Sequence, residues 1–330
     1  MKHFYLVLLV GLLACATSWQ AAETSALQQV QTIPLANVEG RIDHFSVDIQ
    51  GKRLFVSALG NNTLEVIDLQ AGKRATSISG LKEPQGVLYV PGLNKIFVTN
   101  AGDGTCRIFD TGSYHPIDTL HFSSDADNVR YDAARKQVYV GYGEGALGII
   151  DATTNKLLGE IPFRGHPESF QLETSGPRIF VNVPTDGHIA VVDREKRAIV
   201  ATWPIEEARA NFPMALDEPD HRLFVVSRKP ARLLVLDARS DKVLVSLPSV
   251  GDADDVFYDA AHKRIYISGG EGFLEVFKQD DADHYRRIER IGTASGARTS
   301  LFVPELNRLY LAVPHRGSQG AEIRVYEAQP

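Results

Sequence analysis

The sequence predicts an all-β fold, a seven-bladed β-propeller of four-stranded blades, from three observations. A doublet of apolar residues returns seven times, at intervals of about 42 residues. Each doublet lies in a short apolar run followed by a turn and a second, alternating run, which is the pattern of a β-hairpin. One hairpin cannot bury its own apolar faces, so the repeats must stack on one another. The doublets are Leu54-Phe55, Ile96-Phe97, Val138-Tyr139, Ile179-Phe180, Leu223-Phe224, Ile265-Tyr266 and Leu309-Tyr310.

The order of the expected strands indicates how the ring closes. In the first repeat the four strands should begin near residues 43, 53, 63 and 74. The last repeat stops after its third strand, whereas an alternating run at residues 30–35 precedes the first repeat. We expect this N-terminal run to pair beside residues 322–326 as the fourth strand of blade seven, because that pairing leaves no open edge at the junction. Residues 23–330 would then form one propeller domain.

The second repeat reads Phe97-Val98-Thr99-Asn100, followed by Ile108-Phe109-Asp110. This pattern resembles the YVTN-repeat (YncE-like) family of seven-bladed β-propellers, found in many extracytoplasmic bacterial proteins. The resemblance covers all seven repeats and implies the fold. It implies no particular activity, because propellers host many unrelated functions.

The N-terminus has the features of an export signal. Lys2 and His3 precede an apolar run at residues 4–13, which has the length of a signal-peptide core and is too short to span a bilayer. We predict that residues 1–22 are a signal peptide and that the mature protein is periplasmic or secreted. Residues 12–15 also resemble a bacterial lipobox, in which Cys15 would carry a lipid anchor to the cell envelope. Cleavage after Ala14-Cys15-Ala16 without lipidation is the alternative.

The composition is that of an ordinary soluble domain. The 330 residues are 44% hydrophobic and 23% charged, with a net charge of -6. Because no basic excess is present, a nucleic-acid partner is not expected. No later segment is apolar enough to cross a membrane, so any membrane association would come through Cys15. We expect a monomer.

A polar layer lies at the start of the innermost strands, eleven residues before each doublet. Innermost strands converge on the propeller axis, so these side chains should meet at the mouth of the central channel. They lie on the upper face, which carries the hairpin between the second and third strands of each blade. The layer consists of Asp43, Gln85, Asp127, Glu168, Phe212, Asp254 and Arg298.

Clustered carboxylates repel one another unless a cation, an arginine or water offsets their charge. Carboxylate and amide oxygens suit a hard divalent ion. We therefore predict Asp43, Asp127, Glu168 and Asp254 as ligands of Ca²⁺ or Mg²⁺. The third repeat, Asp125-Ala126-Asp127-Asn128, also resembles the sixth, Asp252-Ala253-Asp254-Asp255, which lies nearly across the ring.

Polar side chains in and beside this layer are candidates for ligand binding. Two histidines would add nitrogen ligands and shift the preference toward a transition metal. The arginines offer a metal-free alternative, an ion-pair network that neutralises the acidic ring. Arg130 lies between two core positions of its strand and needs an acidic partner or the water of the channel. The candidates are Arg41, His44, Asn128, Arg130, His166, Asp255 and Arg298.

The polar layer allows two function hypotheses. The chain has no nucleophile motif, haem-attachment motif or phosphate-binding loop. This favours a binding or scaffold protein that takes a polar small molecule or a protein segment on its upper face. The layer is also similar to the metal-binding layer of the gluconolactonase and senescence-marker propellers, although Asn128 lies one position away from it. That resemblance implies a metal-dependent lactonase, with a carboxylate or His166 as the base.

Overall fold

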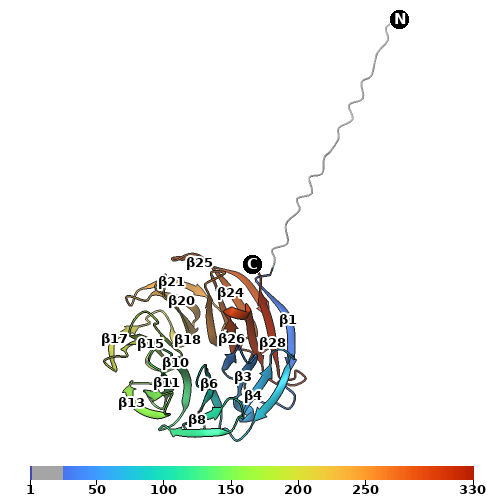
Figure 1. The fold of residues 1–330 in the computed structure, drawn as a ribbon. Coiled ribbons are helices and arrows are strands. Elements are labelled where there is room, and N and C mark those ends of the chain that lie inside the picture. Colours follow the sequence, from blue (N-terminus) through green and yellow to red (C-terminus); the bar gives the residue numbers. More distant parts are fainter. Residues whose placement is uncertain (2–24) are drawn as a thin grey trace.

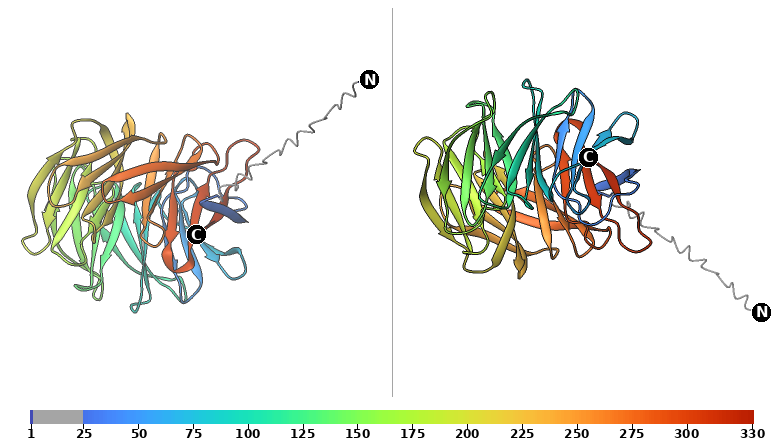
Figure 2. Two further views of the ribbon diagram at one scale, coloured as in Figure 1. Left: turned by 90° about the horizontal axis from the view of Figure 1, so that it is seen from above. Right: turned by 90° about the horizontal axis from the view of Figure 1, so that it is seen from below.

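The computed structural model describes residue 1 and residues 25–330, and the latter form a ring of seven four-stranded antiparallel sheets (Figure 1). Seen from two further sides, the ring is a flattened body (Figure 2). Within these residues the only helical segments are two single 3-10 turns, η1 (Leu59–Asn61) and η2 (Pro304–Leu306). The all-β, seven-bladed prediction is confirmed.

Blades one to six run outward from the axis in chain order, and in blade seven β1 from the N-terminus is the outermost strand. Blades one to four consist of β2 (Phe45–Asp48), β3 (Arg53–Ala58), β4 (Thr63–Asp68) and β5 (Lys73–Ile78); β6 (Pro84–Val90), β7 (Lys95–Asn100), β8 (Thr105–Asp110) and β9 (Pro116–His121); β10 (Ala126–Asp132), β11 (Gln137–Tyr142), β12 (Ala146–Asp151) and β13 (Lys156–Pro162); and β14 (Phe170–Leu172), β15 (Arg178–Val183), β16 (His188–Asp193) and β17 (Ala198–Pro204). Blades five to seven consist of β18 (Arg209–Asp217), β19 (Arg222–Lys229), β20 (Ala231–Asp237) and β21 (Val243–Pro248); β22 (Ala253–Asp259), β23 (Arg264–Gly269), β24 (Phe273–Asp281) and β25 (His284–Gly292); and β26 (Ser300–Val303), β27 (Arg308–Val313), β28 (Glu322–Ala328) and β1 (Leu27–Pro34).

The N-terminal strand closes the ring, as predicted. Strand β1 pairs antiparallel with β28, with Ile33 opposite Ile323, and the blue strand lies beside the red one in Figure 1. Leu27 and Ile33 are buried, whereas Val30 lies at a register shift and is 43% exposed. The strand therefore holds blade seven through its two ends, where its apolar side chains enter the core.

The repeated doublets form the core between blades. All fourteen of their side chains are at most 1% exposed. Each apolar cluster joins neighbouring blades; for example, Leu54 of blade one and Tyr310 of blade seven lie in one cluster with Ile33. Because every blade contributes the same positions, burial is repeated around the ring, and this explains why the sequence period is so regular.

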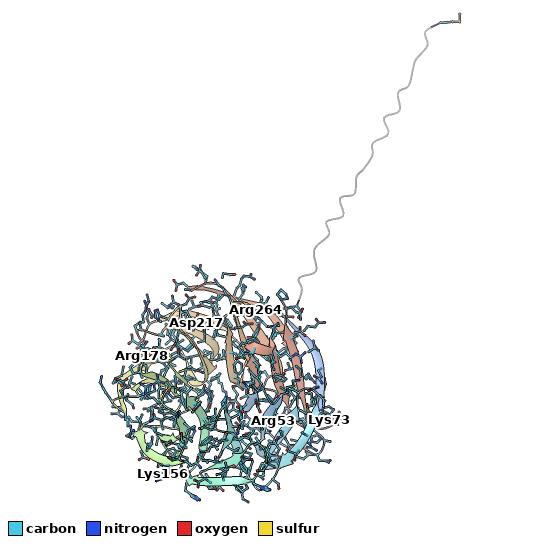
Figure 3. All side chains as sticks on the ribbon, in the orientation of Figure 1. Arg53, Lys73, Lys156, Arg178, Asp217 and Arg264 are labelled. Atoms are coloured by element: carbon cyan, nitrogen blue, oxygen red, sulfur yellow. The ribbon has the colours of Figure 1, made fainter. Side chains whose placement is uncertain are left out.

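Basic side chains at the start of the second strands also join the blades. They lie on the lower face, the side of the ring opposite the hairpins between second and third strands. Each reaches a backbone carbonyl of the next blade. In four cases that carbonyl lies in the turn after the third strand of the next blade, and for Arg264 it belongs to Ala26, just before β1. Figure 3 labels three of these side chains on separate sides of the ring. The contacts are Arg53 to Thr111 (2.7 Å), Lys95 to Ala152 (2.8 Å), Arg178 to Ala238 (2.5 Å), Arg222 to Ala282 (2.7 Å) and Arg264 to Ala26 (3.3 Å).

Blade three departs from this pattern, because the equivalent residue is Gln137. Here Arg194 of blade four reaches back instead and places its guanidinium 2.7 Å from Oδ2 of Asp132 at the end of β10. Both side chains are almost completely buried. This pair therefore replaces the missing basic contact between blades three and four.

The predicted signal peptide, residues 1–22, lies outside the described part of the chain except for residue 1, and so does the lipobox cysteine Cys15. In residues 25–330 no helix has the length and apolar character needed to cross a membrane.

Candidate functional site

The predicted polar layer does meet at the channel mouth. A hollow of about 380 Å³ opens there, and six of the seven layer residues line it, so the alignment of the repeats was correct in these blades. Asp43, the seventh, is completely buried beside it. We use "channel mouth" for this hollow, lined by Arg41, Leu59, Glu83, Gln85, Ala101, Asp125, Asp127, His166, Glu168, Phe212, Arg228, Asp254 and Arg298.

β-Bulges direct these side chains toward the mouth. The pairing of the innermost strand with its neighbour shifts register between Ala126 and Val129 in β10, and between Ala253 and Asp255 in β22. A bulge adds a residue and breaks the strict alternation of a strand, so neighbouring residues can both point away from the core. Side chains of the second strands satisfy carbonyls in these segments; Thr99, for example, donates a hydrogen bond to the carbonyl of Asp127.

One half of the mouth is an ion-pair network centred on Asp254. Arg228 pairs with this carboxylate, Nε of Arg298 lies 2.7 Å from it, and a guanidinium nitrogen of Arg41 lies 4.0 Å from it. Arg41 also lies 2.5 Å from the buried Asp43. The guanidinium of Arg228 stacks over Phe212, 3.8 Å from the ring centroid, which explains an aromatic residue in a polar layer.

The other half is a group of two carboxylates and one imidazole. Asp127, His166 and Glu168 each offer a ligand atom, and these atoms all lie within 4.8 Å of one another. Nδ1 of His166 lies 2.7 Å from the carbonyl oxygen of Gly143. Because a carbonyl oxygen only accepts, Nδ1 carries a proton, and Nε2 is the nitrogen that loses its proton when the imidazole becomes neutral. That Nε2 lies 3.6 Å from Oδ2 of Asp127.

Oδ1 of Asp127 is buried and has no hydrogen-bond partner among residues 25–330. Burial and the charge of Asp127 raise the pKa of Glu168 to about 8, so this carboxyl group is largely protonated at neutral pH. Burial opposes the charge of His166, but its contacts with Asp127 and Gly143 outweigh burial and raise its pKa to about 9. Protons on Glu168 and His166 thus offset the negative charge of the group, and a bound cation would take their place.

His44 lies between two buried carboxylates just below the mouth. Its Nε2 is 3.4 Å from Asp43 and its Nδ1 is 3.6 Å from Asp255. Burial opposes its charge, but Asp255 and Asp43 outweigh burial and raise the pKa of His44 to about 10. Burial raises the pKa of Asp43 to about 6, despite the attraction of His44 and Arg41.

The proton on His44 predicts a pH-dependent stability. The folded state keeps it up to about pH 10, whereas the unfolded chain loses it near pH 6.5. The contribution of this proton to the free energy of unfolding is complete below pH 6.5 and is lost as the pH rises through 10. Between pH 7 and 10 we expect the free energy of unfolding of the wild type to fall, relative to His44→Gln, by about 2–4 kcal/mol. Denaturant unfolding of both proteins across this range measures the difference, and parallel curves would contradict the assignment.

No family model matches the chain. Two curated proteins are similar to it, and each has the name uncharacterized protein YncE. The one from Salmonella typhi is 23% identical over 198 residues, and the one from Salmonella typhimurium is 22% identical over 197 residues. Each match covers 58% of this chain and 55% of the relative, so the chain spans about half the length of the curated relatives it matches. Together with the seven-bladed ring, this similarity supports the resemblance to YncE-like propellers. The chain is a seven-bladed β-propeller similar to YncE.

A solved structure of Kuenenia stuttgartiensis hydrazine synthase has the same fold. It superimposes with a TM-score of 0.75, covers 84% of this chain and 94% of the matched chain, and is 15% identical. At that identity the likeness shows the fold alone. The name of neither YncE relative states an activity, so the function must be argued from the site.

The structure divides the predicted metal ring into two halves. Asp127 and Glu168 come together with His166, whereas Asp43 and Asp254 are paired with arginines. The predicted ligand-binding residues Arg41, His166 and Arg298 line the mouth.

The other predicted ligand-binding residues lie deeper. His44, Arg130 and Asp255 line a second chamber in the channel, and Asn128 is buried outside both hollows. Arg228 was not among the predicted site residues, although it pairs with Asp254. The isolated Phe212 in the polar layer was the available signal, because arginine stacks on aromatic rings.

Proposed function

We propose that the protein is an exported binding protein whose channel mouth holds a polar small molecule beside a divalent metal ion. One observation carries the proposal. Asp127, His166 and Glu168 face one hollow from blades three and four, and Asp127 has a buried oxygen without a hydrogen-bond partner in the described chain.

The donor set fits a transition metal better than Ca²⁺ or Mg²⁺, because imidazole is a ligand for ions such as Zn²⁺. Ligand atoms bound to one Zn²⁺ ion lie roughly 3–4 Å apart, and the His166–Asp127 separation of 3.6 Å agrees with this. The Gly143 carbonyl accepts a hydrogen bond from Nδ1 and so leaves Nε2 as the nitrogen that a metal would bind, an arrangement common for histidine ligands. Three protein ligands would leave a coordination position open to the hollow.

The rest of the mouth favours a polar small molecule. Its volume of about 380 Å³ lies within the range of small-molecule sites. Arg41 is partly exposed at one side, while Gln85 and Asp125 lie at another and are hydrogen-bonded to each other. Because the mouth offers both donors and acceptors, a molecule with both, such as a sugar acid or an amino acid, matches it better than a simple anion. Insertion of a side chain from a protein segment is the other partner to test.

Export is part of the proposal and rests on the charge and apolar pattern of residues 1–22. Mass spectrometry of the mature N-terminus from the native cell would separate lipidation at Cys15 from simple cleavage. An unprocessed cytoplasmic chain would contradict export.

Thermal unfolding with EDTA, Ca²⁺, Mg²⁺, Mn²⁺ and Zn²⁺ tests the metal. We expect stabilisation of the wild type by Mn²⁺ or Zn²⁺, about 2.7 kcal/mol at a hundredfold excess over Kd. Asp127→Asn should lose most of this gain, because it removes a charged ligand. Asp254→Asn is the matched control: it disturbs the arginines but should keep the metal response. Equal melting temperatures of the wild type in all five conditions would contradict the metal site.

The same cluster favours a second candidate, a metal-dependent lactonase. A bound divalent ion would polarise a lactone carbonyl. His166 would then be a ligand, so the base would be Asp125, whose pKa is raised by burial. Lactone hydrolysis that appears with Mn²⁺ or Zn²⁺ and disappears in Asp127→Asn would favour the enzyme. Metal binding without turnover of a lactone panel would favour the binding protein.

A further inference from the structure

A second hollow lies deeper in the channel and is separate from the mouth. It has a volume of about 380 Å³, and no residue lines both hollows. His44 and Asp255 line it, and each is adjacent in sequence to a residue of the polar layer. Further lining residues lie two positions later along the innermost strands, such as Ser46 and Phe257. Six blades each contribute one half-buried, channel-facing side chain. These are Ser46, Leu88, Arg130, Gln171, Phe257 and Leu301. We call this hollow the lower chamber.

Arg130 is the only arginine or lysine among the lining residues of the lower chamber. Its guanidinium has five N–H donors, yet its one hydrogen bond within residues 25–330 goes to the carbonyl of its own neighbour, Val129 (2.9 Å). No carboxylate oxygen of the described chain lies within 4.0 Å of it. The guanidinium also lies over the face of Phe170, 5.5 Å from the ring centroid.

The other charges of the chamber do not offset Arg130. Asp255 accepts a hydrogen bond from the backbone of Ser300 (2.8 Å) and lies beside His44. His44 is protonated at neutral pH, so the charges of Asp255 and His44 cancel. Burial lowers the pKa of Arg130 more than the charges of Asp255 and Asp127 raise it, so its charged form is only partly compensated. The chamber therefore holds a guanidinium that no carboxylate of residues 25–330 contacts directly.

Three of the six channel-facing side chains are apolar, while Ser46 and Gln171 are polar and uncharged. Leu88, Phe257 and Leu301 are only partly buried although they lie inside the ring. Apolar surface kept in contact with confined water favours an apolar occupant. The chamber thus combines a free guanidinium with apolar walls.

We propose that the lower chamber is a second binding site, which takes a small organic monocarboxylate with an apolar body. Arg130 binds the carboxylate in a two-pronged contact, as arginine does elsewhere, and the apolar body packs on Leu88, Phe257 and Leu301. This site is independent of the metal and of the proposed ligand of the mouth. The competing account is that water links Arg130 to Asp255, and it predicts no preference for carboxylates.

Calorimetry of EDTA-treated protein with octanoate and phenylacetate, and with octanamide and phenylacetamide, tests the proposal. We expect at least one acid to bind, and its uncharged amide to bind about tenfold or more weakly. Arg130→Gln should lose the preference for the acid, whereas Arg130→Lys should keep part of it. Arg298→Gln, a mouth variant, should bind the acid like the wild type.

Two outcomes would overturn the lower-chamber site: no acid of the set binds the wild type, or Arg130→Gln binds the acid as tightly as the wild type. Loss of acid binding in Arg298→Gln with normal binding in Arg130→Gln would place the acid in the mouth and also reject this site. EDTA removes any metal before calorimetry, so the acid titrations test the lower chamber without the metal site. The metal site is tested separately, by thermal unfolding with added ions.

Discussion

A chain that begins at residue 36 is expected to fail to fold, because it lacks β1. This strand supplies the outer edge of blade seven and buries Leu27 and Ile33. Without it, β28 becomes an open edge, and unpaired edges promote aggregation. A chain that begins at residue 25 keeps β1 and is the matched control. Circular dichroism and size-exclusion chromatography of the two chains measure the effect, and a folded monomer beginning at residue 36 would refute ring closure by β1.

Single substitutions in β1 make the same test without truncation. Ile33→Ala should lower the free energy of unfolding by about 2–5 kcal/mol, because Ile33 is 1% exposed. Val30→Ala, on the exposed side of the same strand, should change it by less than about 0.5 kcal/mol. Similar effects from the two substitutions would mean that β1 does not enter the core as described.

Replacing Arg194 with methionine is the second change expected to have a large effect. Its guanidinium lies 2.7 Å from Asp132 and donates to the carbonyls of Glu173 (2.6 Å) and Gly176. Methionine fills part of the space but leaves a buried carboxylate with only one remaining cation, the partly exposed Arg135. Removing one partner of a buried ion pair costs about 3–5 kcal/mol. We expect a loss of that size in denaturant unfolding.

Arg197→Met is the control for Arg194→Met. Arg197 is exposed and makes one hydrogen bond, to the carbonyl of Leu158 (3.0 Å). Its replacement should change the free energy of unfolding by less than about 1 kcal/mol. If Arg194→Met were equally mild, the proposed contact between blades three and four would contribute little to stability.

The sequence predicts the ring and the composition of the mouth well for a physical reason. Each doublet is buried by the same contact with its neighbouring blade, so burial leaves a period in the sequence. The polar layer, eleven residues before each doublet, therefore repeats with the same period, and six of its seven residues line the mouth. The orientation of Arg130 into the channel also follows, because Val129 and Tyr131 occupy the core positions on either side of it.

The pairing of charges could not be predicted from the repeat. Asp127 and Asp254 occupy equivalent positions in similar segments, yet one faces His166 and Glu168 while the other faces arginines. The difference arises from neighbours that do not repeat. Arg228 lies near the end of β19, which has eight residues where the second strands of the other blades have six. The longer strand carries the guanidinium over the mouth.

Anomalous diffraction from crystals grown with Zn²⁺ or Mn²⁺, recorded at the absorption edge of the metal, tests the central claim most directly. We predict one strong peak within bonding distance of Asp127, His166 and Glu168, and no peak there in crystals of Asp127→Asn. A peak between Asp43 and Asp254, or no peak in the channel mouth of the metal-grown wild type, would contradict the account.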